Sequence, residues 1–154
     1  MLLQRDTSYW LLLSASMLWL AMLLGAAWTR SLGWPVAEFV YLALDPVCHQ
    51  MPGRSFFCFG EPLAACHRCV GLYVGFVAGL LVLPHWHGLR RALLDQPRRL
   101  LLFSIPMLAD VFLWENIWQT RVLTGFLAAF PFSLFVWAAF AQLAQQRQTV
   151  EDTP

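Results

Sequence analysis

A stretch of twenty residues without a charged side chain, from Tyr9 to Trp28, constrains the fold of this chain more than any other feature. The hydrocarbon core of a bilayer is about 30 Å thick, and roughly 20 apolar helical residues cross it. Tyr9, Trp10 and Trp28 stand at the ends of the stretch, where aromatic side chains favour the membrane interface. We therefore expect a transmembrane helix, kept as an uncleaved anchor because a signal peptide has a shorter apolar core, roughly 7 to 15 residues.

The same apolar character extends over the whole chain of 154 residues, of which 59% are hydrophobic and 12% are charged. Such a composition is typical of an integral membrane protein and leaves little room for a separate soluble domain. We predict an all-α fold, a single domain over residues 1–154 with about four transmembrane helices. The expected crossings lie at about 9–28, 64–83, 100–118 and 122–143.

The connections between these crossings differ in length and content. The long first connection contains Trp34 to Leu44, apolar at helical spacing, and Pro46 follows it; we expect a short interfacial or re-entrant helix there. Only Gln119, Thr120 and Arg121 separate the third and fourth crossings, which predicts a tight antiparallel hairpin. In the second crossing, glycines recur every four residues and predict a flat face for a neighbouring helix, at positions Gly71, Gly75 and Gly79.

Soft, ionisable side chains gather in the segment 45–69, at the mouth of the second crossing. Thiolate and imidazole groups at tetrahedral range are the ligands that zinc selects. The first hypothesis is therefore a zinc site formed by Cys48, His49, Cys66 and Cys69, with His67 or Cys58 as replacement ligands. Four protein ligands would make the site structural. Three ligands and a water would allow hydrolysis, with Glu61 or Glu115 as candidate bases.

The second hypothesis is thiol redox chemistry. Cys66 and Cys69 begin a helix, where the helix dipole and Arg68 favour the thiolate form, and both are candidate catalytic residues. Cys48 and Cys58 would then form a shuttle pair, in a layout similar to that of quinone-linked disulfide-generating membrane enzymes. A bound quinone is the cofactor of this alternative, and static disulfides or inert thiols are the third possibility for the sulfur atoms.

Acidic residues interrupt the third crossing at Asp110 and Glu115. An ionisable group at that depth costs a few kcal/mol, so it faces protein or water. An ion pair with Arg68 or Arg121 is the simpler explanation, and ion or proton transport through Asp110 is a weaker alternative. Sequence alone leaves open whether the protein is an enzyme.

The cysteine-rich segment contains two distinctive runs. The first begins with Cys48, His49 and Gln50 and continues through Arg54, Ser55 and Phe56; the second is Cys66-His67-Arg68-Cys69 with the glycines that follow. These runs resemble the signature of a family of small membrane proteins, the domain of unknown function two thousand eighty-five. The similarity continues through Pro106 and Asp110 and through Asn116, Arg121, Thr124 and Gly125. It implies a multi-pass membrane fold and no established activity. Cys58 departs from the pattern, as does the lack of a small residue after Asp110.

Together these features predict a small membrane protein whose external loop is tied to the second helix, most simply through zinc, in a structural or complex-assembly role. The lipid bilayer and other subunits of a membrane complex are the expected partners. Nucleic acid is not, because the net charge is only +1 and the ten basic residues, all arginine, are dispersed.

The arginines also predict the orientation in an inner membrane. Arg90, Arg91, Arg98 and Arg99 crowd the second connection, which the positive-inside tendency places in the cytoplasm together with both termini. A periplasmic reporter inserted at Gly60 should therefore be active, and one at Arg91 inactive. The reverse pattern would contradict this orientation and place the sulfur atoms in a reducing compartment, which disfavours disulfides.

Overall fold

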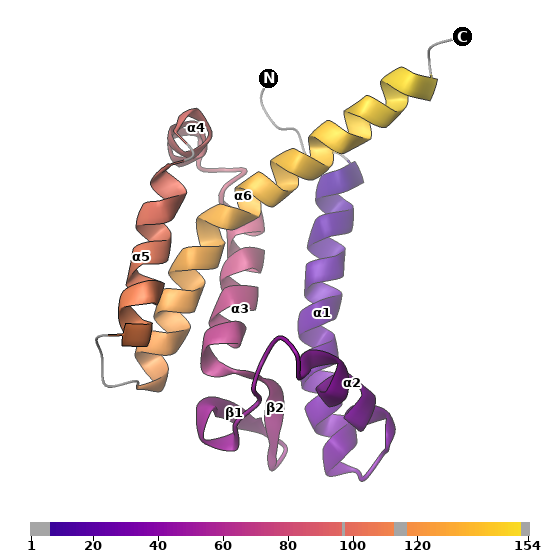
Figure 1. The fold of residues 1–154 in the computed structure, drawn as a ribbon. Coiled ribbons are helices and arrows are strands. Elements are labelled where there is room, and N and C mark those ends of the chain that lie inside the picture. Colours follow the sequence, from indigo (N-terminus) through magenta and orange to yellow (C-terminus); the bar gives the residue numbers. More distant parts are fainter. Residues whose placement is uncertain (1–6, 97, 113–116, 152–154) are drawn as a thin grey trace.

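The computed structural model describes residues 7–96, 98–112 and 117–151, and most of them are helical (Figure 1). A hairpin of two short strands lies between the second and third helices. In chain order the elements are α1 (Thr7–Ser31), α2 (Val36–Leu44), a 3-10 turn (Pro52–Arg54), β1 (Ser55–Cys58), β2 (Glu61–Cys66), α3 (His67–Val82), α4 (His87–Asp95), α5 (Arg99–Phe112) and α6 (Trp118–Glu151).

Two helices are long and apolar enough to cross a membrane: α1, and α6 over Trp118–Leu143. A third span is present if α3 and α4, which are bent by 113° relative to each other, count as one. The prediction of about four crossings is therefore confirmed only as two, or up to three, among the described residues. One reason is that the helix expected over 64–83 begins only after residue 66, because residues 64–66 belong to strand β2. Another is that α5 is described over only 14 residues.

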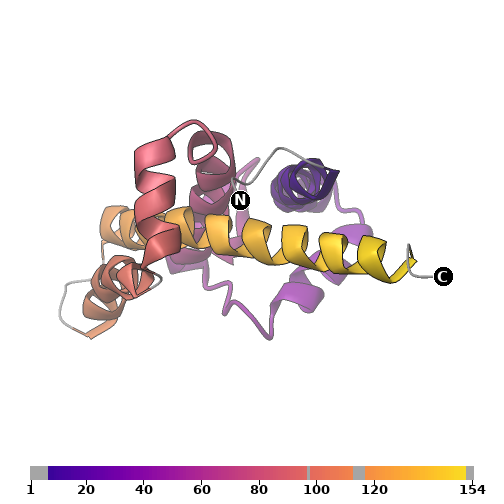
Figure 2. The same ribbon diagram turned by 90° about the horizontal axis from the view of Figure 1, so that it is seen from above.

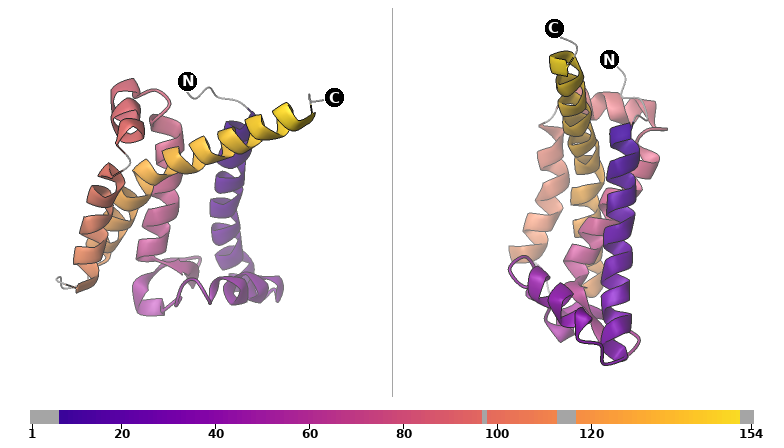
Figure 3. Two further views of the ribbon diagram at one scale, coloured as in Figure 1. Left: turned by 45° about the horizontal axis from the view of Figure 1, so that its top comes forward. Right: turned by 90° about the vertical axis from the view of Figure 1, so that its right-hand side faces the viewer.

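The helices are arranged around α6. Seen from above, α5, α3 and α1 follow one another along the length of α6 (Figure 2). Helix α2 and the hairpin lie across one end of these helices, and α4 lies at the opposite end (Figures 1 and 3). The start of α1 is at the same end as α4, so the thiol-bearing segments and the arginine-rich α4 are separated by the length of the bundle.

The glycine face predicted for the second crossing is confirmed. A Cβ atom added to any of the three glycines of α3 would overlap backbone atoms of α6. The absence of side chains thus lets the two backbones approach closely, which is how small residues drive helix association in membranes. The facing pairs are Gly71 with Val122, Gly75 with Phe126, and Gly79 with Phe130. In return, Gly125 of α6 lies against the backbone of Arg68.

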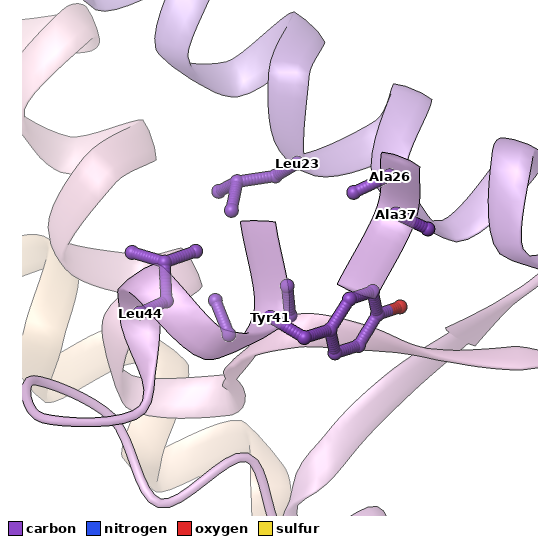
Figure 4. Close-up of a cluster of buried hydrophobic side chains, with 7 residues drawn as sticks. Leu23, Ala26, Ala37, Tyr41 and Leu44 are labelled. Atoms are coloured by element: carbon purple, nitrogen blue, oxygen red, sulfur yellow. The ribbon is translucent and has the colours of Figure 1, made fainter. Parts of the chain in front are cut away.

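Two apolar clusters hold α1 against the rest of the protein. Near the hairpin, Leu23 and Ala26 of α1 pack on Ala37, Tyr41 and Leu44 of α2 (Figure 4), together with Ala64 and Ala65 of β2. At the other end, Tyr9 packs on the ring of Trp137 and donates a hydrogen bond of 3.1 Å to the carbonyl of Leu80. We call α2 and the hairpin the end layer. Helix α1 therefore contacts both the end layer and the helices α3 and α6.

The helix predicted in the first connection is present as α2, whereas the β-hairpin was not predicted. Ser55 pairs with Cys66, Phe57 with Pro62, and Cys58 with Glu61. Phe59 and Gly60 form the turn with positive φ values of 58° and 84°, as a tight two-residue hairpin loop requires. These strands are too short and irregular to show an alternating pattern, and Pro62 excludes a helix interior there.

Three further predictions need correction. Gln119, Thr120 and Arg121 do not form a connection, because α6 begins at Trp118 and contains them. The same helix continues to Glu151, beyond the expected end at Leu143. The arginine-rich connection holds the unpredicted α4, whose Leu93 is buried in the cluster around Tyr9.

The glycine contact predicts a position-specific loss of stability. Gly75→Ala should lower the free energy of unfolding by about 1–3 kcal/mol, because the added methyl group has no room against Phe126. Gly25→Ala is the matched control: no atom lies within 4 Å of its Cβ position, so the change should be neutral or stabilise by about 1 kcal/mol. Thermal unfolding in detergent measures both variants, and equal behaviour would contradict the close α3–α6 contact.

Candidate metal centre

Three cysteines from different parts of the chain meet where the loop passes the start of α3. Cys48 follows α2, and its N–H donates a hydrogen bond of 2.9 Å to the carbonyl of Leu44, which closes the turn after that helix. Cys66 is the last residue of β2, and Cys69 lies in the first turn of α3. The end of α2, the hairpin and α3 thus each bring one thiol to the same place.

Local backbone features hold Cys48 in position. Gln50 adopts a left-handed conformation with φ of 46°, which is unusual for a residue other than glycine. Its side-chain amide donates a hydrogen bond of 2.6 Å to the carbonyl of Tyr41. The hydroxyl of Tyr41 in turn donates one of 2.6 Å to the carbonyl of Pro62 in β2. The loop that carries Cys48 is therefore tied both to α2 and to the strand that carries Cys66.

The three sulfur atoms all lie within 4.8 Å of one another. The Sγ atoms of Cys66 and Cys69 are 3.6 Å apart, and the backbone N–H of Cys66 donates a hydrogen bond of 3.1 Å to Sγ of Cys48. Cys48 is buried, while the other two are half-buried. All four cysteines of the chain are free thiols. A group of three thiols at this spacing could hold a metal ion.

The surroundings favour the thiolate form of Cys66. The hydrogen bond from the Cys69 thiol is the main cause that lowers the pKa of Cys66, to about 4, and burial opposes it. Cys66 also immediately precedes α3, where the helix dipole favours negative charge. A thiolate is the form that binds metal ions and acts as a nucleophile.

A cavity of about 470 Å³ opens beside the thiols. It is lined by the three thiols, by His49, by three arginines and by several apolar side chains. The full set of lining residues is Val47, Cys48, His49, Met51, Arg54, Cys66, Arg68, Cys69, Leu72, Met107, Val111 and Arg121. The thiols therefore face a space large enough for a ligand.

The remaining predicted ligands and bases lie in different places. His49 is exposed and lines the same cavity, outside the group of three thiols. His67 is buried between the rings of Phe56 and Trp118, with centroid distances of 4.4 and 6.4 Å. Cys58 lies beside the hairpin turn, and Glu61 forms an ion pair of 3.7 Å with Arg30. Neither of these two lines the cavity.

The acid predicted to lie within the membrane, Asp110, forms an ion pair with Arg68 and is buried. This contact joins α5 to the first turn of α3, which also carries Cys69. It confirms the expectation that an arginine neutralises the acid. Arg121 lines the cavity from α6. Two other predicted polar residues, Glu115 and Asn116, lie outside the described residues.

Sequence reasoning assigned no role to several residues of the site. Arg54 stood in the motif without a function, and the apolar lining residues of α5, Met107 and Val111, carried no signal of their own. Their position follows from the packing of α5 beside α6, which places a distant segment next to the thiols. The place of Arg54 in the run that begins with Cys48 and His49 was the one signal that could have linked it to the site.

Comparison with known proteins places the chain in a family. The family described as "Predicted membrane protein (DUF2085)" matches residues 48–135, more than half of the chain, and the chain belongs to it. An uncharacterised protein of Methanocaldococcus jannaschii is 32% identical over 113 residues, covering 70% of this chain and 72% of the relative. No solved structure matches. The matched region contains all three clustered thiols and Asp110.

The pKa of Cys66 predicts its reactivity. In metal-free protein with the Cys58→Ser change, alkylation of Cys66 by iodoacetamide should increase with a midpoint near pH 4, because the thiolate forms above its lowered pKa. Replacing Cys69 by Ala removes the hydrogen bond to Cys66 and should move the midpoint toward the ordinary cysteine value of about 8.5. Mass spectrometry of the labelled peptide measures alkylation against pH in both proteins. The same alkaline midpoint in both would contradict the effect of Cys69 on the pKa of Cys66.

Proposed function

We propose that Cys48, Cys66 and Cys69 bind one thiophilic divalent metal ion, most simply zinc. The spacing of the sulfur atoms carries this proposal. In a tetrahedral zinc site with Zn–S bonds of about 2.3 Å, neighbouring sulfur atoms are about 3.8 Å apart. The Sγ atoms of Cys66 and Cys69 are already 3.6 Å apart, and Cys48 lies within 4.8 Å of both. Only a small adjustment is needed to close three ligands around an ion.

His49 is our candidate for the fourth ligand. It follows Cys48 directly and lines the same cavity, so rotation of an exposed side chain would bring it toward the ion. His67 is less suited, because it is enclosed by Phe56 and Trp118. With His49 bound the site would be closed and structural; with water or an external ligand in the fourth position it would be open.

The role that this arrangement supports best is structural. An ion held by these cysteines would cross-link the turn after α2, the end of β2 and the start of α3. The exposed apolar side chains of the same layer, including Phe39, Leu42 and Phe57, support assembly with lipid or with another membrane subunit. We place this layer on the external side of an inner membrane, from the distribution of the arginines.

The other two hypotheses have weaker support. The close pair Cys66 and Cys69 is compatible with thiol redox chemistry, in which two thiols form a disulfide and pass two electrons and two protons to a quinone. Cys58, the expected shuttle partner of Cys48, lies outside the group of three thiols, which favours a metal site. The ion pair of Asp110 with Arg68 gives that acid a structural role and weakens the case for transport.

Elemental analysis tests the proposal. Protein purified in detergent, without chelators or a metal-affinity tag, should contain about one zinc or other transition metal per chain. Cys66→Ser should lose most of the metal and unfold at a lower temperature, because ligand binding stabilises the folded state. Cys58→Ser is the matched control, since this cysteine lies outside the group of three thiols, and it should keep the metal.

Two results would count against the metal site. Unchanged metal content in Cys66→Ser would show that the ion is bound elsewhere. Absence of metal from protein kept reduced throughout purification would exclude a resident ion, and trapping of Cys66 and Cys69 with an alkylating agent would then test the redox alternative.

A further inference from the structure

We propose that the end layer, formed by α2 and the hairpin, lies in the interfacial region of the bilayer, with phospholipid against its exposed apolar side chains. Three observations carry this inference: the length of α3, the level at which exposed tryptophans lie, and the apolar side chains that the end layer turns away from the protein. The inference concerns a different surface from the metal site and does not require a bound ion.

Helix α3 is too short to carry the hairpin out of the bilayer. Its 16 residues span about 24 Å, whereas the hydrocarbon core is about 30 Å thick. At the far end of α3 the chain bends by 113° into α4, where Trp86 and Arg91 are exposed. Such side chains favour the membrane surface. With α4 at one surface, the hairpin at the start of α3 lies in the interfacial region of the opposite leaflet.

Exposed tryptophans mark the same depth on different parts of the chain. Trp28 lies near the end of α1, Trp34 lies just before α2, and Trp118 begins α6; these side chains are 50–57% exposed. The ring of Trp118 also packs edge-on against Phe56 of the hairpin, with centroids 5.7 Å apart. Tryptophan is enriched between the headgroups and the acyl chains. That region therefore lies at the level of the end layer itself.

Helix α2 is apolar on two opposite faces. Ala37, Tyr41 and Leu44 are buried in the cluster that includes α1. On the other face, Phe39 and Leu42 are 71% and 72% exposed. A helix that is apolar on its outer face is unfavourable in water and is stabilised where that face meets lipid. The position of α2 across the end of the long helices suits a helix that lies along the membrane plane (Figure 3).

The hairpin exposes aromatic rings that its turn does not require. Phe59 has a φ of 58°, and glycine, asparagine or aspartate is favoured over a bulky residue in that conformation. Its ring is nevertheless 65% exposed, and that of Phe57 is 60% exposed. Turn geometry therefore does not account for these rings, whereas contact with lipid does, because exposed apolar patches are typical of membrane-binding surfaces.

This position has a consequence for the cavity beside the thiols. Val47 and Met51, in the loop between α2 and the hairpin, are exposed and also line the cavity. The rim of the cavity therefore lies at the same depth as the end layer. An amphiphilic molecule dissolved in the bilayer would reach the cavity without leaving the membrane.

Photocrosslinking in vesicles of phosphatidylcholine tests the lipid contact. The photoreactive residue p-benzoylphenylalanine replaces Phe39, Phe57 or Phe59, one at a time, and mass spectrometry identifies what it attaches to. Each position should give phosphatidylcholine adducts with a yield close to that of the same replacement at Leu18, which is 71% exposed in the middle of α1. Gln96, an exposed polar residue after α4, is the negative control, and its yield should be several times lower.

The products distinguish lipid from protein and water. Crosslinks to a second copy of the chain, or yields no higher than that of Gln96, would overturn the inference. Lipid adducts at Phe39 with none at Phe57 and Phe59 would overturn it for the hairpin. A thermal unfolding temperature close to that of the wild type shows that each substituted protein is folded. Metal content in the same samples reports separately on the metal site.

Discussion

The contact between α3 and α6 is the constraint on which the rest of the structure depends. Three glycines of α3 allow its backbone to touch that of α6, and Gly125 of α6 lies against the backbone of Arg68. In a membrane there is little hydrophobic gain from bringing apolar helices together, so close packing of this kind supplies much of the association energy. The contact also fixes how the first turn of α3 lies against the first turn of α6. It therefore fixes the positions of Cys69 and Arg68 relative to Arg121.

The end layer, formed by α2 and the hairpin, brings Cys48 and Cys66 to the start of α3. Helix α2 is held on α1 by a small apolar cluster and by Arg30, which lies 4.2 Å over the ring of Tyr41 and pairs with Glu38 at 3.1 Å. Tyr41 is hydrogen-bonded to both the loop of Cys48 and the strand of Cys66. Packing and hydrogen bonds alone therefore place Cys48 beside the other thiols, without a covalent link.

The site combines two kinds of chemistry at one end of a membrane protein. Thiols, arginines and apolar residues of α5 all line one cavity. The Arg68–Asp110 pair joins these parts, since Arg68 lines the cavity while its partner is buried in α5.

The sequence by itself determined the membrane class, the apolar helices α1 and α6, the short helix α2 and the glycine face of α3, because length, apolar content and residue spacing are local properties. It also identified the thiols as the candidate site. Only the tertiary structure decided which of them meet: Cys58 and Cys66 lie on paired strands of one hairpin, yet the register leaves Cys58 at the turn, while Cys66, at the other end, lies beside Cys48. The arginine-lined cavity likewise depends on the packing of α3, α5 and α6. Contacts between residues far apart in the chain arise from that packing, which no local pattern records.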